Sequence, residues 1–329
     1  MRTQAMLVRK YGGPEVLEHA EIEVPAPGTG EVLLRHLAIG VNFVDIYYRA
    51  GQFGQDSPPL PAIVGVQGAG IVEAVGPASK SSSSLAVGDL VGYAGQPGAY
   101  VEHRVLAADR LIKLPAGMSA ELAAASLVRG LTAEYLLRRL YKVQPGDTIL
   151  FHAAAGGVGR IACQWAKALG ATVIGTVGSD EKARIAAAHG CDHPIVYTRE
   201  DFVAKVMEIT SGRGVPVVYD SVGRDTFMRS LDCLRPMGMA VNFGTASGQV
   251  ENFPLQRLLK KSLIVTRPTL TTWIADRDDY VRAAAAFFEV VASGAVRVEV
   301  GTRYPLRQAA RAHIDLESRR ASGMPVLIP

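Results

Sequence analysis

The strongest chemical signal in the chain is a glycine-rich run, Phe151–Gly159 (FHAAAGGVG), that follows an apolar stretch. The spacing of Ala154, Gly156 and Gly159 is a variant of the G-x-G-x-x-G fingerprint of dinucleotide-binding turns. Gly156 would let the backbone approach a pyrophosphate, and Gly159 would let a helix pack on its strand. The N–H groups of the helix N-terminus would bind the anion. In isolation such a motif can also be a turn without a ligand.

The residues after the next strand indicate which dinucleotide is bound. An NAD site usually carries Asp or Glu at the end of this strand, but here it ends Gly175-Thr-Val-Gly-Ser179. Asp180 and Glu181 follow inside the first helical turn, where they complement the helix dipole. Lys182 and Tyr197 are suitable partners for a 2′-phosphate, although Lys182 could also be a solvated helix residue. The pattern favours NADPH.

These residues need a repeated strand–helix framework, and the middle of the chain predicts one. Apolar strands are expected at residues 148–152, 171–177, 195–197, 217–219 and 239–243. Helices are expected between them, one opened by Ser179 and closed by Gly190, another at 202–209 and another near 226–234. This alternation is typical of α/β proteins with a doubly wound parallel sheet.

The two ends of the chain have a different pattern. Short β-like runs at 5–9, 32–38 and 71–75 are separated by Gly/Pro turns, and Ser79–Ser84 is expected to be an exposed loop. Ser119 could cap a helix, while 278–292 predicts another helix and 325–328 a last strand. We therefore expect a nucleotide-binding domain at 126–265, inserted into a second domain formed by 1–125 and 266–329.

Composition excludes several classes of protein. The net charge of +4 is only mildly basic and no dense Lys/Arg run occurs. An ordinary soluble surface is the first explanation of this charge and a site for a phosphorylated ligand is the second, while nucleic acid is not an expected partner. No apolar stretch reaches the ~18–20 residues of a membrane span, and no signal peptide is expected. Three widely spaced cysteines, Cys163, Cys191 and Cys233, favour a reducing cytoplasm.

The segment Leu150–Gly170 (LFHAAAGGVGRIACQWAKALG) resembles the cofactor-binding turn and helix of the zinc-independent NADPH quinone oxidoreductases. This group of the medium-chain dehydrogenase/reductase superfamily includes the zeta-crystallins. The resemblance extends along the whole chain through 12–17 (GGPEVL), 39–45 (IGVNFVD), 218–223 (VYDSVG), 265–268 (VTRP) and 316–319 (LESR). It implies a GroES-like β-rich catalytic domain around a Rossmann domain, a homodimer, and a cleft for cofactor and substrate.

The resemblance also implies roles for individual residues. Asn42 and Tyr47 are expected beside the nicotinamide, and Tyr47 is the candidate hydrogen-bond donor to the substrate. Contacts with the nucleotide are expected from Thr132, Ala155, Gly156, Gly157, Val158, Gly175, Ser179, Lys182 and Tyr197. The site is completed by Ser221, Phe243, Gly244, Thr245, Arg267 and Arg319, and Phe53, Gln67 and Thr132 are expected to line the substrate pocket.

Differences from relatives are equally informative. Zinc-dependent relatives carry Cys at the position of Asn42 and Gly-His-Glu at the position of Gly65-Val-Gln67, and the lobe with four cysteines is missing. No tetrahedral zinc site is therefore expected. Within the quinone oxidoreductases, Gln67 replaces a frequent Glu and Phe53 stands where a pocket tyrosine can occur.

The chemistry expected from these residues is hydride transfer from NADPH to a conjugated acceptor. A quinone is the first candidate substrate, and an enone or alkenal on the same scaffold is the second. A different possibility, suggested by the crystallin resemblance, is an NADPH-binding protein with an RNA-binding or structural role. Zinc-dependent alcohol oxidation is the remaining alternative, and the missing ligands disfavour it.

Overall fold

The computed structural model of the protein describes residues 1–77, 85–318, 320 and 323–329. The predicted Ser79–Ser84 loop lies outside these residues. The chain separates into two units: unit 1 comprises Met1–Val128, Asp276–Ala284 and Val298–Pro329, and unit 2 comprises Arg129–Ala275 and Ala285–Arg297. The predicted nucleotide-binding domain ended at residue 265, whereas unit 2 continues to Ala275 and also includes Ala285–Arg297.

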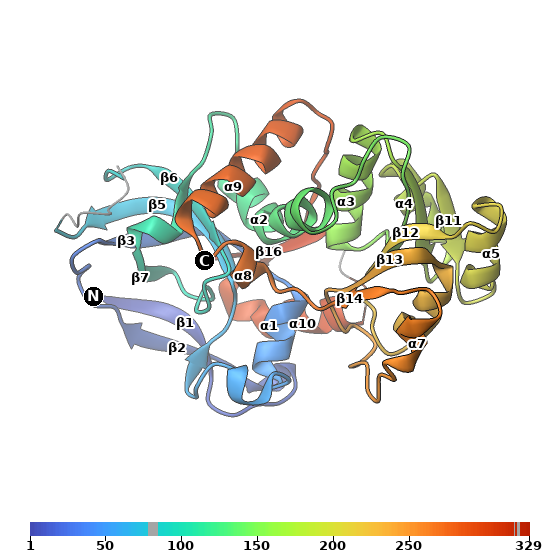
Figure 1. Ribbon diagram of the computed structural model, residues 1–329. Helices are drawn as coiled ribbons and strands as arrows, with labels where there is room; N and C mark the ends of the chain where they lie inside the picture. The colour runs from blue at the N-terminus through green and yellow to red at the C-terminus, as the bar shows by residue number, and fades with distance from the viewer. Residues whose placement is uncertain (78–84, 319, 321–322) are drawn as a thin grey trace. The chain divides into compact units, whose positions relative to one another are not determined.

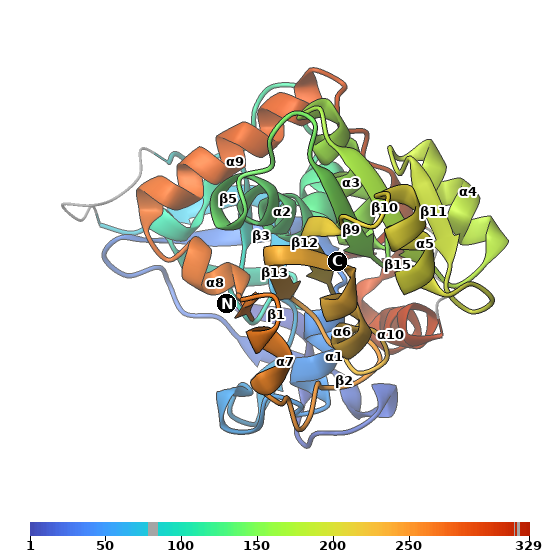
Figure 2. The ribbon, with the colours of Figure 1, turned by 45° about the vertical axis from the view of Figure 1, so that its right-hand side comes forward.

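Unit 2 is built on a six-stranded parallel sheet in the order β11-β10-β9-β12-β13-β14. Figure 2 shows β10 between β9 and β11. The strands are β9 (Thr148–His152), β10 (Thr172–Val177), β11 (His193–Val196), β12 (Val215–Asp220), β13 (Leu234–Asn242) and β14 (Ile264–Thr266). Counted from β9, this is the 3-2-1-4-5-6 order of the doubly wound dinucleotide-binding fold. The predicted fold class is confirmed.

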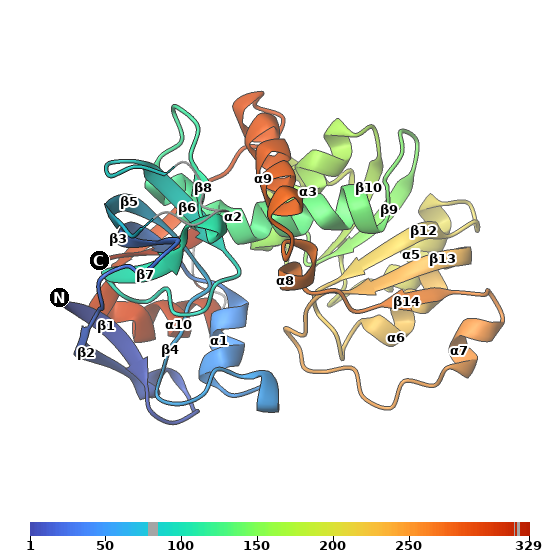
Figure 3. The same ribbon diagram turned by 60° about the vertical axis from the view of Figure 1, so that its left-hand side comes forward.

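Helices cover both faces of this sheet. In Figure 3, α3 lies above the strands and α6 below them. The helices of this unit are α3 (Gly157–Ala168), α4 (Asp180–Ala188), α5 (Phe202–Ile209), α6 (Phe227–Ser230), α7 (Gln256–Leu259) and α8 (Leu270–Trp273). Buried Leu150, Ile174 and Val218 of the sheet pack with Phe202 and Phe227 in one core.

Capping residues explain where several helices begin. The Ser179 hydroxyl accepts a hydrogen bond from the Lys182 N–H at 3.3 Å, and the Asp201 carboxylate accepts from Val203 N at 2.9 Å. Gly170 and Gly190, which follow α3 and α4, both have φ of +85°, a conformation that glycine adopts without strain. The sequence predicted α5 at its observed bounds and α4 between its two capping residues.

Unit 1 is β-rich (Figure 1). One sheet has the order β2-β1-β4, and the other has the order β15-β16-β3-β5-β6-β8, with β7 also paired to β3. The strands are β1 (Arg2–Val8), β2 (Leu17–Glu23), β3 (Glu31–Gly40), β4 (Ala62–Ile63), β5 (Gln67–Val75), β6 (Leu90–Ala94), β7 (His103–Ala107), β8 (Ile112–Lys113), β15 (Val300–Pro305) and β16 (Met324–Ile328). Its short helices are α1 (Phe43–Arg49) and α10 (Ala309–Glu317).

Two long helices each contain one unit boundary, after Val128 in the first and after Ala284 in the second. Helix α2 (Ala120–Glu134) begins after Ser119, whose hydroxyl accepts from Leu122 N at 3.1 Å, and continues as a π-helical segment, Tyr135–Leu140. Helix α9 is Arg277–Ala292. Among the described residues, none of the helices has the length and apolar character of a membrane-spanning segment.

The core of unit 1 contains a neutral histidine held by hydrogen bonds of fixed direction. His36 Nδ1 lies 2.7 Å from the Val101 carbonyl, which only accepts, so Nδ1 carries the proton. His36 Nε2 must then accept from the Tyr93 hydroxyl at 2.9 Å, and Arg104 donates to the same hydroxyl at 3.2 Å. Burial, together with the nearby Arg104 charge, lowers the pKa of His36 to about 3.

This burial predicts a specific acid sensitivity. The unfolded chain protonates His36 near its ordinary pKa of 6.5, while the folded protein resists protonation down to a pKa of about 3. Stability from this group is therefore complete above pH 6.5 and lost as the pH falls. Between pH 7.5 and 5 the free energy of unfolding should fall by ~2 kcal/mol for such a histidine. In urea unfolding of His36→Asn, the free energy of unfolding should change less between pH 7.5 and 5 than it does in the parent protein, by this amount.

The matched control is His19→Asn, at an exposed position on β2. This variant should keep the pH dependence of the parent protein. If the free energy of unfolding changed equally with pH in the parent and in His36→Asn between pH 7.5 and 5, the lowered pKa of His36 would be contradicted.

Candidate functional site

The glycine-rich turn of unit 2 connects β9 to α3, and within it the backbone segments lie too close together to leave room for side chains. A methyl group on Gly159 would lie 2.5 Å from the Ala153 carbonyl oxygen and 2.6 Å from that of Ala154. Gly156 N donates to the Ala153 carbonyl at 2.8 Å, and Ala153 adopts a φ of +54°. Gly159 therefore permits the contact between helix and strand that the sequence predicted.

The N-terminus of α3 is shaped for an anion. The exposed Gly156 is its N-cap residue and offers no side chain to the first N–H groups of the helix. Gly157 and Val158 begin the first turn and are half-buried, as is Ala155 before them. The positive end of the helix dipole adds to these donors. The turn therefore has the donors that a pyrophosphate requires.

Arg129 adds a guanidinium group to this turn. A methyl group on Gly157 would come within 2.5 Å of Arg129 Nε, so the absence of a side chain at this position makes room for the arginine. Arg129 is 6% exposed. The sequence analysis did not select it, because nothing in the spacing of α2 links this arginine to the glycine run.

The turn also lies at the point where the sheet order reverses. Strand β9 has β10 on one side and β12 on the other, so the carboxyl ends of β9 and β12 diverge into loops that run in opposite directions. Ligands of open α/β sheets bind at such a switch point.

A cationic corner follows β10. Gly175 lies within β10, where a methyl group would meet Ala154 Cβ and Cys191 Sγ at 2.6 Å each, so this glycine lets the turn pack on the strand. At the end of the strand, a methyl group on Gly178 would lie 3.6 Å from the Tyr197 hydroxyl. The structure thus brings Tyr197 next to the segment that leads to Ser179 and Lys182.

The carboxylate nearest this corner is already engaged. Asp180 accepts two hydrogen bonds from Arg199, each 2.6 Å long. The Arg199 guanidinium lowers the pKa of Asp180, and both side chains are exposed. Arg199 was missed by the sequence analysis, although its position two residues after Tyr197 was a usable signal. Lys182, Arg199 and Tyr197 give this corner the chemistry of a phosphate site.

A second cluster forms at the ends of β12, β13 and β14. A methyl group on Gly244 would lie 2.9 Å from the Ser221 carbonyl oxygen, so the two loops pack closely. Asn242 donates to the Gly244 carbonyl at 2.9 Å and accepts from Arg267. Of the other predicted residues here, Phe243 packs near Phe151 and Thr245 packs against Gly223.

Asp220 holds the Ser221 loop from below. Its Oδ1 accepts from Val222 N at 2.7 Å and from Gly223 N at 2.9 Å, while its Oδ2 accepts from the Thr226 hydroxyl at 2.7 Å. Asp220 is fully buried. Neither Asp220 nor Asn242 was selected from the sequence, since a polar residue at a strand end does not indicate by itself which loop it will hold.

His152, beside the glycine turn in the sequence, belongs to the same buried framework. Its two ring nitrogens lie 2.7 Å from the Thr176 hydroxyl and 2.8 Å from the Ser230 hydroxyl. Burial lowers the pKa of His152 more than the nearby Asp220 raises it, so the ring is neutral. Both nitrogens are used to join neighbouring elements, which makes His152 a structural residue.

In unit 1, Asn42 and Gln67 form a buried amide pair. Gln67 Nε2 lies 3.4 Å from Asn42 Oδ1, and Gln67 Oε1 accepts from Val128 N at 2.6 Å. Asn42 is 6% exposed, yet within the described part of the chain its Nδ2 has no hydrogen-bond partner. A buried donor without an acceptor costs ~1–3 kcal/mol, which is a reason to expect that a ligand supplies the acceptor.

Asn42 also begins the helix that carries Tyr47. Asp45 Oδ2 accepts from Asn42 N at 2.8 Å in a capping box that starts α1. Half-buried Tyr47 packs edge-on against Phe53, with ring centroids 5.8 Å apart, and Phe53 is 36% exposed. Three of the residues expected at the substrate therefore lie on α1 or next to it.

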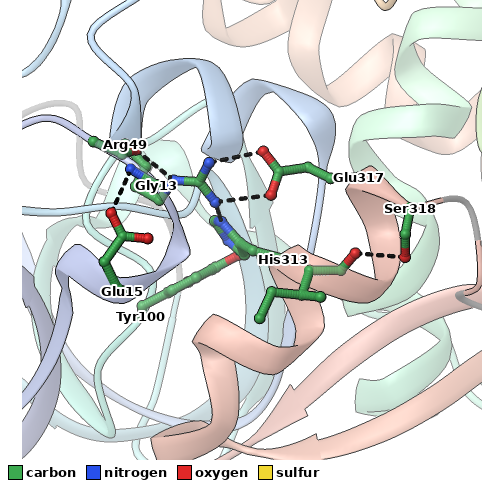
Figure 4. A network of polar contacts seen from close by, with 9 residues as sticks. Gly13, Glu15, Arg49, Tyr100, His313, Glu317 and Ser318 are labelled. Atoms are coloured by element: carbon green, nitrogen blue, oxygen red, sulfur yellow. Dashed lines mark hydrogen bonds and ion pairs between the residues drawn. The ribbon is translucent and has the colours of Figure 1, made fainter.

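A chain of polar contacts connects Arg49 of α1 to residues of α10, and Figure 4 shows Arg49 with His313 and Glu317. Arg49 donates to His313 Nδ1 at 3.0 Å, and because arginine only donates, the ring proton lies on Nε2. Nε2 then donates to the Tyr100 hydroxyl at 2.9 Å, which donates to Asp45 Oδ2 at 3.1 Å. Burial, with the Arg49 charge, lowers the pKa of His313 to about 3.

The chain of contacts ends at α10. Arg49 Nη2 lies 2.8 Å from Glu317 Oε1, and Arg49 Nε donates to the Gly12 carbonyl at 3.1 Å. Glu317 precedes Ser318 and then Arg319, the predicted cofactor residue, which lies outside the described residues. The remaining predicted residue, Thr132, is buried on α2. Over the described ranges, no group of three or more His, Cys, Asp or Glu side chains is arranged to hold a metal ion.

Comparison with known proteins agrees with this architecture. The family model described as an alcohol dehydrogenase GroES-like domain matches residues 28–116, and the one described as a zinc-binding dehydrogenase matches 157–289. A quinone oxidoreductase of Pseudomonas aeruginosa is 50% identical over 322 residues, which are 97% of this chain and 97% of that protein. A 2-haloacrylate reductase of a Burkholderia species is 43% identical over 99% of this chain and 98% of its own length.

The structural comparison leads to the same group. The crystal structure of Escherichia coli quinone oxidoreductase complexed with NADPH matches with a TM-score of 0.93 and 47% identity, covering 99% of this chain and 100% of that chain. The family predicted from the sequence is confirmed. With this similarity along nearly its whole length, the chain belongs to the zeta-crystallin-like quinone oxidoreductases of the medium-chain dehydrogenase/reductase superfamily.

Proposed function

We propose that this protein is an NADPH-dependent oxidoreductase that reduces quinones by hydride transfer without a metal. The observation that carries the proposal is the nucleotide site of unit 2. An uncapped helix N-terminus follows the glycine turn, and a corner with Lys182, Tyr197 and Arg199 lies where NAD-specific sites place a free carboxylate. The solved relative in complex with NADPH supports the choice of cofactor.

The described residues divide the binding task. The N–H groups of Gly157 and Val158 are proposed to hold the pyrophosphate, and Arg129 would add a positive charge. Ser179, Lys182 and Tyr197 are proposed to hold the 2′-phosphate and ribose. The Ser221 loop, fastened by Asp220, and the Asn242–Arg267 pair are proposed to hold the remainder of the cofactor, with Thr132, Phe243, Gly244, Thr245 and Arg319 completing the site.

NADPH supplies the hydride when it is bound, and the residues of unit 1 are proposed to act on the acceptor. As the hydride reaches the quinone, negative charge develops on a carbonyl oxygen, and hydrogen-bond donors stabilise that charge. Tyr47 and Asn42 are the proposed donors, and Phe53 and Gln67 would line the pocket. Water can supply the proton that completes the hydroquinone. Zinc is not invoked, because Asn42 and Gln67 stand where zinc-dependent relatives carry metal ligands.

A second candidate reaction is the reduction of a conjugated carbon–carbon double bond. The similarity to a 2-haloacrylate reductase favours it, since that name denotes a substrate with such a bond. The donors required are the same, because the charge again develops on an oxygen conjugated to the bond. A homodimer and a cytoplasmic location are further proposals that rest on the family resemblance and on cysteine usage.

Cofactor titration tests the proposal first. Binding of NADPH should quench the tryptophan fluorescence of the purified protein. The concentration of NADPH needed for this quenching should be at least tenfold lower than the concentration of NADH. Adding 1,4-benzoquinone should then oxidise NADPH, which is followed at 340 nm. If NADPH were oxidised only in the presence of a simple enone, the protein would be an alkene reductase rather than a quinone reductase. Absence of binding to both cofactors would refute the proposal.

Lys182 should determine the preference for the phosphorylated cofactor. Removing its charge in Lys182→Ala should raise the KM for NADPH about tenfold, equivalent to ~1.4 kcal/mol, and leave the KM for NADH unchanged. The matched control is Lys205→Ala, because Lys205 is a half-buried residue of α5 that pairs with Glu208. Equal changes for NADPH and NADH in Lys182→Ala would remove Lys182 from the 2′-phosphate site.

The hydroxyl group of Tyr47 should act on the acceptor rather than on the nucleotide. Tyr47→Phe keeps the ring contact with Phe53 and removes only the donor. We expect kcat for 1,4-benzoquinone to fall about tenfold, while the dissociation constant of NADPH stays within twofold. Tyr48→Phe is the neighbouring control, and its kcat should match that of the parent. An unchanged kcat in Tyr47→Phe would assign Tyr47 to the pocket wall.

A further inference from the structure

In the buried amide pair of unit 1, Asn42 and Gln67, one backbone group determines which atom of each amide donates and which accepts. Val128 N lies 2.6 Å from the side chain of Gln67, and a backbone N–H can only donate. The atom of Gln67 that faces it must therefore be the oxygen. The nitrogen of Gln67 must then face Asn42, from which it is separated by 3.4 Å. The orientation of one amide is thus fixed by the main chain of α2.

The same reasoning fixes the second amide. Gln67 Nε2 only donates, so the group of Asn42 that faces it must be the oxygen. A reversed Asn42 would bring two donors together, and it would also break the capping box, in which the Asn42 side chain accepts from the Asp45 backbone N–H. Asn42 Nδ2 is consequently directed away from Gln67, and it is the atom that is buried without an acceptor among the described residues. The pair therefore presents a hydrogen-bond donor.

Close packing holds the Gln67 amide, and the capping box holds Asn42. Gln67 is fully buried, and a methyl group on Gly40 would lie 2.1 Å from Gln67 Nε2 and 2.1 Å from the Ala124 carbonyl oxygen. The backbone of Asn42 is held in its turn by Asp45. The donor is therefore in place before any ligand arrives, which is the condition for electrostatic stabilisation without reorganisation.

We propose that Gln67 is a positioning residue that makes Asn42 a hydrogen-bond donor to the carbonyl oxygen of the substrate. This inference rests on the proposed function. The hydride brings two electrons to the conjugated acceptor, negative charge appears on the carbonyl oxygen, and a proton from water completes the product. A donor at Asn42 stabilises that oxygen, so the pair selects substrates that present an acceptor.

A glutamate at position 67 would reverse this polarity. A carboxylate only accepts, so it would accept from Val128 N and from Asn42 Nδ2 together. This charge-assisted contact would replace the capping-box contact between the Asn42 oxygen and the Asp45 N–H, and Asn42 would present its oxygen to the substrate. A protonated glutamate would behave as glutamine does, because its hydroxyl could donate to Asn42 Oδ1. Burial would raise the pKa of such a glutamate.

The experiment uses Gln67→Glu with NADPH and 1,4-benzoquinone. Relative to the parent protein at the same pH, kcat/KM for the quinone should fall about tenfold at pH 8, and the deficit should shrink to less than threefold at pH 5.5. The dissociation constant of NADPH should stay within twofold at both pH values. A constant deficit, or none, across this range would overturn the proposal, since loss of packing alone gives no such pH profile.

Two further variants isolate the pathway through Asn42. Asn42→Ala removes the donor, so adding Gln67→Glu to it should cause less than a twofold further loss at pH 8. A full tenfold additional loss in the double variant would show that Gln67 acts by another route. Gln308→Glu makes the same chemical change at an exposed position before α10 and should match the parent.

The design also covers failure to fold and failure of the proposed function. Circular dichroism checks each variant, and if Gln67→Glu does not fold, Gln67→Met replaces it. Gln67→Met removes the donor that faces Asn42 Oδ1 without adding charge, and it should lower kcat/KM three- to tenfold at every pH; parent values would overturn the proposal. If the parent binds NADPH but reduces no quinone, the proposed function fails on that result alone, and the same variants are compared on an enone.

Discussion

The arrangement of unit 2 depends on backbone segments that lie so close together that only glycine fits between them. Gly159 meets the carbonyls of Ala153 and Ala154, and Gly175 meets Ala154 from the neighbouring strand, each at distances that a methyl group could not share. Helix α3, strand β10 and the turn between β9 and α3 are thereby drawn together. The first N–H groups of α3 and the cationic corner beyond β10 can then be reached by parts of one nucleotide. A single added carbon at either glycine would separate them.

Local chemistry made much of this predictable. The glycine spacing, the alternation of strands and helices and the capping residues Ser119 and Ser179 are short-range signals, and the elements they predicted are present. The residues that join loops are not readable in this way. Asn242 matters because it connects the Gly244 loop to Arg267, and Arg199 because it neutralises Asp180. Such roles depend on which strands become neighbours, and the sheet order decides that.

The candidate site of unit 1 shows the same limit more sharply. The sequence was sufficient to select Asn42, Tyr47 and Gln67 as site residues. It could not predict which atom of the Asn42 amide, the oxygen or the nitrogen, would remain available to a ligand. That availability follows from a hydrogen bond between Gln67 and the backbone of Val128, 61 residues later in the chain. Residue type specifies which donors and acceptors exist, whereas only the folded contacts specify which of them remain available. One unit boundary falls within α2 and another within α9, where no turn or change of composition marks them, and the other boundaries lie just before and just after α9.

The way the ends of the chain meet has a consequence for synthesis. Strand β16 pairs with β3, and Glu317 reaches Arg49 across 268 residues, whereas the six-stranded sheet of unit 2 is complete once Thr266 has been made. A ribosome therefore releases all strands of the nucleotide-binding sheet while unit 1 still lacks β15, α10 and β16. During that interval the edge of β3 has no β16 to pair with and the buried Arg49 lacks its carboxylate partner. The part of the protein that is synthesised first is the part that finishes folding last.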